Sequence, residues 1–165
     1  MKKISILFLV ITLLLLGSCS MNRSNDKNRS ISEIYVYHYS ETADPFEEYK
    51  IDFVNKEFTI LAREKVFAGA QGHAVKRDSP VVKKLSDDMI EDFLKAAKKN
   101  KFADWEEHYA DPDIMDGHQW RIDITFSDGT VKEISGSNAY PKTWDAMYRA
   151  FERLTGEKVL FVKTK

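Results

Sequence analysis

Alternating apolar and polar positions predict several short β-strands in this chain. The first covers residues 34–39, where Ile34, Val36 and His38 occupy one face and three tyrosines occupy the other. A strand with bulky side chains on both faces is typical of a central position in a sheet. We therefore expect this strand to have a neighbour on each side.

A β-hairpin is predicted directly afterwards. Apolar residues alternate with polar ones on both sides of Asn55-Lys56, a dipeptide suited to a tight turn because Asn tolerates a positive φ. A two-residue turn at this point pairs Phe53 with Phe58 and Ile51 with Ile60. Residues 63–85 contain glycines, Pro80 and little periodicity, so they are predicted to be a long loop.

A second hairpin is predicted around Asp128-Gly129. The strand before it has one apolar face, made by Trp120, Ile122, Ile124 and Phe126. Val131 and Ile134 have opposite parity in the return strand, which favours a bulge there. A final apolar run over residues 159–162 is interpreted as a last strand.

Two amphipathic helices follow the hairpins. Ser86 followed by two aspartates is typical of a helix start, and the next residues have an apolar stripe formed by Ile90, Phe93, Leu94 and Ala97. Pro141 is expected to open the second helix, and Gly156 to end it. Its stripe consists of Trp144, Met147, Tyr148, Phe151 and Leu154.

The predicted order is therefore ββ-α-ββ-α-β. Antiparallel hairpins alternating with amphipathic helices indicate an α+β fold, in which both helices pack on one face of the sheet. The domain is expected to span residues 33–165, which is a usual length for one domain.

The N-terminal segment has the layout of an export signal. Lys2 and Lys3 precede an apolar run over residues 4–16, interrupted only by Ser5 and Thr12. A membrane-spanning helix needs roughly twenty apolar residues, so this run is too short to remain as one.

The residues after the run, Leu16-Gly17-Ser18-Cys19, resemble the lipobox of bacterial lipoproteins. The resemblance implies that residues 1–18 are removed and that Cys19 receives a diacylglyceryl group and a further acyl chain such as palmitate. The alternative is a chance cysteine at the end of an ordinary signal. The lipid implies an anchor on the exported side of the cell membrane or the outer membrane. Residues 19–32 are polar and are expected to form a flexible tether, with a reach on the order of 20 Å.

The charge and the cysteine content limit the kinds of partner and chemistry that are expected. The 165-residue chain has a formal net charge of −1, which argues against a nucleic-acid partner because such proteins present a basic face. The single cysteine is Cys19, so no disulfide partner and no thiol nucleophile remain. No motif for a cofactor is present.

The densest group of potential metal ligands comprises His108, Asp111, Asp113, Asp116 and His118. Zinc and calcium take such side chains, so a metal site is one hypothesis. The spacing departs from the EF-hand template, however, and Asp-Pro and Asp-Gly are ordinary turn residues. The interpretation as turns is therefore favoured.

Two further features have structural and functional interpretations. Trp105, Trp120 and Trp144 are able to stack on sugars, but their apolar stripes favour core packing. The segment from Ser135 to Trp144, SGSNAYPKTW, resembles a phrase in small uncharacterised bacterial proteins, to which no activity is attached. It is expected to be a strand-to-helix corner, with an unusual φ at Gly136 and a hydrogen-bonding role for Asn138.

The sequence favours a non-catalytic binding module of the cell envelope, with an envelope protein as its partner. The alternative is a metal-binding or metal-dependent hydrolytic lipoprotein that uses the group from His108 to His118. Enzymatic activity is not expected, because no catalytic set is recognisable.

Overall fold

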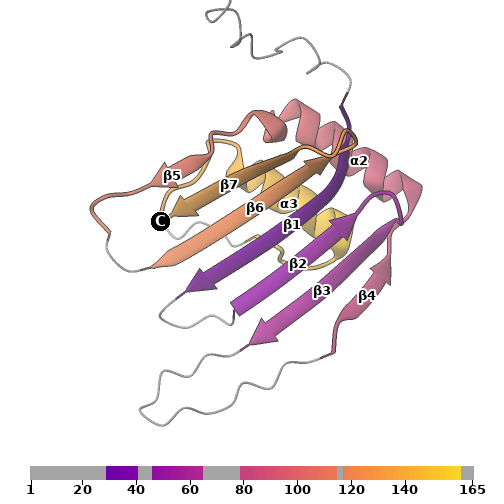
Figure 1. Cartoon of the computed structure of the whole chain (residues 1–165), viewed down its shortest axis with the longest axis horizontal. Helices are drawn as coiled ribbons and strands as arrows, with labels where there is room; N and C mark the ends of the chain where they lie inside the picture. Colours follow the sequence, from indigo (N-terminus) through magenta and orange to yellow (C-terminus); the bar gives the residue numbers. More distant parts are fainter. Residues whose placement is uncertain (1–28, 41–45, 65–78, 115–116, 161–165) are drawn as a thin grey trace, which may run out of the picture.

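A computed structural model describes residues 29–40, 46–64, 79–114 and 117–160, which form an α+β fold (Figure 1). The strands are β1 (Ile31–Ser40), β2 (Phe46–Asp52), β3 (Glu57–Glu64), β4 (Val81–Lys84), β5 (His108–Ala110), β6 (His118–Phe126) and β7 (Val131–Ser137). The helices are α2 (Asp87–Lys99), the short 3-10 helix η1 (Phe102–Asp104) and α3 (Trp144–Thr155). The predicted fold class is confirmed, although the seven-stranded sheet contains more strands than expected.

The sheet order is β4-β3-β2-β1-β6-β7-β5, so β1 is the central strand, as predicted. β1 begins at Ile31, inside the stretch expected to be tether. The residues just before it are also held, because the Ser127 amide donates to the Ser30 carbonyl at 2.8 Å and the Arg29 guanidinium lies 4.0 Å from the centre of the Phe126 ring. The folded domain therefore starts a few residues earlier than the sequence indicated.

The first hairpin is confirmed, but its predicted register is wrong. Ile51 pairs with Phe58 and Asp52 pairs with Glu57, so Phe53 lies in the turn and not opposite Phe58. The loop is thus longer than the two residues expected.

The carboxylate of Asp52 explains the longer loop. It accepts hydrogen bonds from the amides of Val54 and Asn55, at 3.0 and 2.8 Å. This local cap stabilises a turn over residues 53–56, in which Lys56 takes the positive φ (55°) expected of Asn55.

The second hairpin is also confirmed, but its predicted bulge is wrong. The β6–β7 ladder runs without a register shift from Thr125 opposite Val131 to Gln119 opposite Ser137. Val131 has the other parity because it faces away from the core and is 56% exposed, while Ile134 is fully buried. Gly129 supplies the turn with a φ of 83°.

Two edge strands were not expected. β4 lies within residues 63–85, which were predicted to be one loop, and it pairs with β3. β3 runs to Glu64, also inside that range, and residues 65–78 lie outside the described part. β5 pairs in parallel with β7 inside the turn-rich segment. Each is too short for a periodic pattern to reveal it.

The helices follow their predicted stripes closely. The Ser86 hydroxyl accepts a hydrogen bond from the Met89 amide at 3.3 Å, which confirms the start of α2. α3 begins at Trp144 and not at Pro141, because the Pro141 carbonyl accepts the Trp144 amide in a preceding turn. Gly156 ends α3 with a φ of 72°, as expected.

The predicted last strand is wrong for the residues that the structure describes. Val159 and Leu160 are buried in the core but belong to no strand, and residues 161 and 162 lie outside the described part. Packing in the core buries their apolar side chains, and an apolar run alone does not specify that a segment pairs with a sheet edge.

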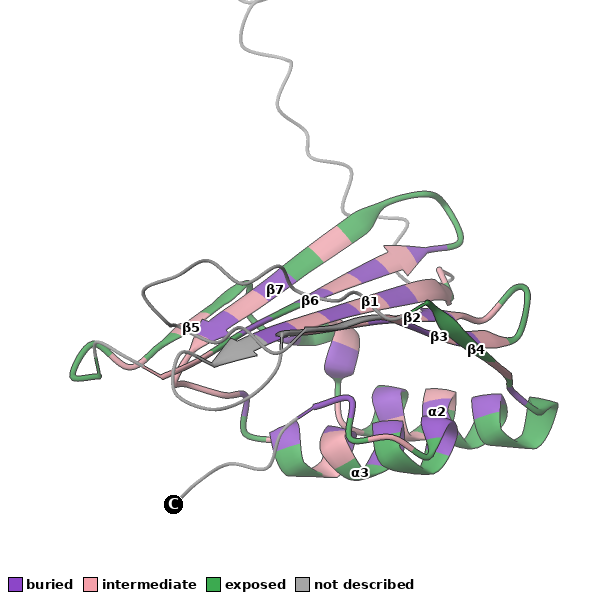
Figure 2. Ribbon diagram, turned by 90° about the horizontal axis from the view of Figure 1, so that it is seen from below, coloured by how far each residue is buried: buried purple, intermediate pink, exposed green. Residues whose placement is uncertain are grey.

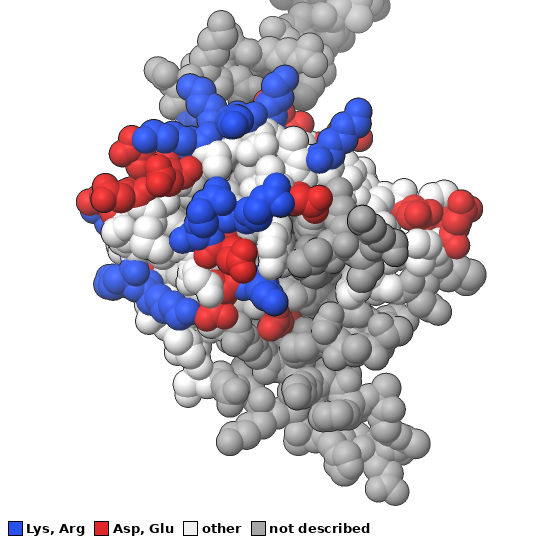
Figure 3. Space-filling view, turned by 180° about the vertical axis from the view of Figure 1, so that it is seen from behind, with Lys and Arg blue, Asp and Glu red and all other residues white. Residues whose placement is uncertain are grey.

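The core lies between the sheet and the helix layer (Figure 2). Inward-facing residues of β1 and β6 pack against α2 and α3, and the two helices meet where the Phe93 and Phe151 rings lie 4.9 Å apart. On the outer surface of the helix layer, positive and negative side chains intermingle (Figure 3). That pattern is typical of an ordinary solvated surface.

Candidate functional site

The predicted metal-ligating residues are not brought together by the described part of the fold. His108 lies on β5, Asp111 and Asp113 lie in the turn after it, and His118 opens β6. Asp116 lies outside the described residues. Among the residues that are described, no group of three or more His, Cys, Asp or Glu side chains is arranged to hold a metal ion.

The two histidines of that segment project to opposite faces of the sheet. His108 pairs with Ser135, whose side chain points away from the helices, whereas His118 has the parity of the buried Trp120. The carboxylate of Asp111 accepts the amide of Asp113 at 3.1 Å, which makes a local turn. Asp111 and Asp113 therefore belong to a turn, as interpreted, whereas the two histidines belong to strands.

A contact that the sequence did not reveal joins His108 to Ser135. The Nδ1 atom of His108 lies 3.0 Å from the Ser135 hydroxyl, the distance of a nucleophile and its base. His108 is exposed, however, and no described carboxylate hydrogen-bonds its other ring nitrogen. The Ser135 hydroxyl also donates to the Glu107 carbonyl at 3.4 Å. The pair therefore offers polar contacts to a ligand without the third group that would orient a catalytic base.

The segment from Ser135 to Pro141 is a structural corner, as expected, but the roles of its residues differ. Gly136 has no positive φ; it is needed because a Cβ there would overlap the indole of Trp120. Asn138 takes the positive φ (57°), and its side-chain oxygen accepts the amide of His118 at 2.9 Å. That oxygen also lies where a Cβ on Gly117 would be.

The tryptophans pack in the core, as the apolar stripes indicated. Trp105, Trp120 and Trp144 are at most 5% exposed, and the rings of Trp120 and Trp144 lie 4.6 Å apart. Their indoles are therefore not available for stacking on sugars.

The sheet face opposite the helices, called the uncovered face below, carries the remaining candidate residues. No helix or strand that the structure describes packs on it (Figure 2). At its centre are Tyr35 and Tyr37 of β1, flanked by Glu48 of β2 and Arg121 of β6. Both tyrosines are half-buried, so aromatic surface remains accessible.

Charged side chains hold the centre of the uncovered face in place. Nε and Nη2 of Arg121 lie 2.8 and 2.9 Å from the two carboxylate oxygens of Asp123, and Nη2 is 3.2 Å from Glu133. Burial, the negative charge of Glu48, its hydrogen bond with Tyr35 and the charge of Asp123 together raise the pKa of Tyr35 to about 12, and burial is the largest of these causes. The Tyr35 phenol therefore remains a hydrogen-bond donor at neutral pH.

A hollow of about 390 Å³ lies on this face over β1, β6, β7 and β5. The polar side chains that contribute to it are Tyr37, His108, Gln119, Arg121, Ser135 and Ser137. Side chains alternate along a strand, so the sequence predicts Tyr37 and Arg121 on the face opposite to Val36 and Ile122. Ser135 joins them because it pairs with Arg121 between β6 and β7, and His108 joins them only because β5 adds to the edge of β7.

A second polar group is enclosed beneath the sheet. His38 of β1 is 6% exposed, and its Nε2 atom lies 3.1 Å from the carboxylate of Glu47 on β2. The phenol of Tyr49 donates to the same carboxylate at 2.5 Å. This group connects β1 to β2 on the face of the sheet that the helices cover.

The predicted lipidation residue, Cys19, lies outside the described residues. No helix in the described part of the chain is long and apolar enough to cross a membrane. A comparison with models of known protein families gives no match, and a comparison with curated proteins gives none either.

Proposed function

We propose that this protein is a lipid-anchored binding module of the cell envelope, which docks an envelope protein partner on its uncovered face. The observation that carries the proposal is the one-sided covering of the sheet. Two helices cover one face, while Tyr37 and Arg121 line a hollow on the other face, with Tyr35 on the same strand as Tyr37.

The composition of the uncovered face favours a protein partner. Tyrosine and arginine are enriched among residues that dominate binding energy at protein interfaces. Tyr37 and Arg121 lie opposite each other on neighbouring strands, and both contribute to the hollow. The pairing of Arg121 with Asp123 restrains its side chain before binding, which lowers the entropic cost of association.

The anchor rests on the residues of the N-terminal segment. Lys2 and Lys3, the apolar run and the sequence Leu16-Gly17-Ser18-Cys19 support export and lipid attachment at Cys19. A tether leading to Ile31 leaves the domain close to the membrane surface. The partner is then a protein of the same surface, since the anchor concentrates both there.

The experiment is affinity capture of the lipidated chain from envelopes solubilised in a mild detergent. We expect one stoichiometric partner, retained by the native chain and lost with the double variant Tyr37→Ala/Arg121→Ala. Loss of two central interface residues should weaken binding by roughly 30-fold or more. The matched control is Arg149→Ala/Glu152→Ala on α3, which removes two exposed side chains, one of them an arginine, from the helix layer.

Two results would contradict the proposal. One is the absence of any stoichiometric partner under conditions in which known envelope complexes survive. The other is undiminished capture by Tyr37→Ala/Arg121→Ala, once thermal unfolding has verified that this variant is folded.

A further inference from the structure

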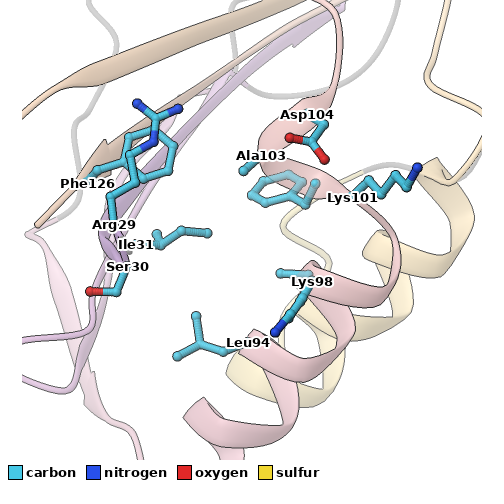
Figure 4. Close-up of a pocket in the computed structure, with 11 residues that line it drawn as sticks. Arg29, Ser30, Ile31, Leu94, Lys98, Lys101, Ala103, Asp104 and Phe126 are labelled. Carbon is cyan, nitrogen blue, oxygen red and sulfur yellow. The ribbon is translucent and has the colours of Figure 1, made fainter. Parts of the chain in front are cut away.

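A second cavity, of about 370 Å³, lies far from the hollow, between the sheet and the end of α2 (Figure 4). Its walls are apolar and come from four elements: Ile31 of β1, Phe126 of β6, Leu94 and Ala97 of α2, and Phe102 and Ala103 of η1. The volume lies within the range of roughly 300–1000 Å³ typical of ligand pockets. Apolar walls of this kind accommodate a hydrocarbon chain.

Cationic side chains stand at the rim of this cavity. Arg29 lies over the Phe126 ring on one side, and Lys98 of α2 lies on the other (Figure 4). Lys101, between α2 and η1, also lines the cavity, and Asp104 is the one acidic residue among the lining residues. The rim therefore carries a net positive charge in a chain whose total is −1, and it complements an anionic head group.

The cavity also lies where the chain leads toward the predicted anchor. Arg29 lines it, and about ten residues separate Arg29 from Cys19, a tether with a reach of about 17 Å. An opening this close to the anchor has the lipids of the same membrane as its most concentrated neighbours.

We infer that this cavity binds an anionic phospholipid of the membrane to which the chain is tethered. Arg29 and Lys98 contact the phosphate, and the first part of one acyl chain lies against Phe126 and Leu94. The choice of a membrane lipid as occupant rests on the proposed anchoring. It is independent of the protein partner, because the uncovered face is not involved.

The test uses the chain from residue 19 onward with Cys19→Ser, so that no covalent lipid contributes to binding. This chain keeps the whole described core, whose residues lie between Ile31 and Leu160. Binding is measured by sedimentation with vesicles of phosphatidylcholine alone and of phosphatidylcholine mixed equally with phosphatidylglycerol. We expect binding to the mixed vesicles, weakened by added salt.

Three variants separate a lipid site from general charge attraction. Arg29→Glu/Lys98→Glu should lower binding by more than about tenfold, since each basic residue near an anionic surface contributes separately. Ala103→Phe fills the cavity without changing charge and should also lower binding. Lys84→Glu/Lys142→Glu changes the net charge equally, away from the cavity, and should bind as the parent chain does.

Several outcomes would overturn the inference. Equal binding to both vesicles would show that the head-group charge is irrelevant. Full binding by Ala103→Phe would show that attraction to surface charge, and not the cavity, causes binding. An equal loss of binding in Lys84→Glu/Lys142→Glu would show that binding depends only on the net charge of the chain. Self-association that Ala103→Phe abolishes would identify a second copy as the occupant. Because the chain is unlipidated and no protein partner is present, none of these outcomes bears on docking at the uncovered face.

Discussion

Substitution of Gly136 by alanine should destabilise the fold far more than its small size suggests. A Cβ at this position overlaps the indole of Trp120, which has little freedom to move. Trp120 is 2% exposed, its ring lies 4.6 Å from that of Trp144, and its Nε1 donates to the Ala139 carbonyl at 3.1 Å. The added methyl group therefore displaces the indole or separates β7 from β6.

The expected cost follows from these contacts. Overpacking of a close-packed core costs about 1–3 kcal/mol. Loss of the hydrogen bond from Trp120 to Ala139 adds about 1 kcal/mol. We therefore expect the free energy of unfolding to fall by about 2–4 kcal/mol and the Tm to fall by roughly 6–12 °C.

Urea unfolding followed by tryptophan fluorescence measures this change. Ser137→Ala, the next residue along the strand and with its side chain on the uncovered face, is the control and should change stability by less than about 0.5 kcal/mol. In a Trp120→Phe background the ring lacks the pyrrole edge that the Cβ meets, so Gly136→Ala should cost markedly less. A cost below about 0.5 kcal/mol for Gly136→Ala in the native background would refute the proposed steric role.

The remaining predictions concern α2 and the uncovered face. Ser86→Ala removes the acceptor of the Met89 amide and should lower the free energy of unfolding by about 1 kcal/mol in urea; an unchanged midpoint would show that the cap contributes nothing. Because the pKa of Tyr35 is raised from 10.0 to about 12 in the fold, its stabilising contribution is complete below pH 10 and is lost as the pH rises toward 12. Tyr35→Phe should therefore reduce the loss of stability between pH 10 and 12, and Glu48→Gln should lower the pKa of Tyr35 in an ultraviolet titration; equal alkaline profiles for Tyr35→Phe and the native chain would contradict this.

The parts of the fold that were predicted are those fixed by local chemistry. The hydroxyl of Ser86, the apolar stripes of α2 and α3 and the period-two pattern of β6 each act over a few residues. The register of the first hairpin was missed because the side chain of Asp52 decides the loop length, and periodicity does not record that bond.

Tertiary contacts decided what the sequence left open. β4 and β5 exist because neighbouring strand edges accept them, and their short segments carry no pattern of their own. The candidate site depended on the same information. Proximity in sequence suggested that His108 and His118 act together, yet pairing of β5 with β7 turns His108 to the uncovered face, beside Ser135. Tyr37 and Arg121 were visible as a strand face, but not as parts of one hollow.

Site-specific photocrosslinking in intact cells tests the central proposal, docking on the uncovered face, most directly. A photoreactive phenylalanine at Gln119, an exposed residue lining the hollow, should give one discrete crosslinked protein in the envelope. The same group at Arg149, on the helix layer, should give none. Equal crosslinking from both positions, or a discrete product from Arg149 alone, would contradict the account.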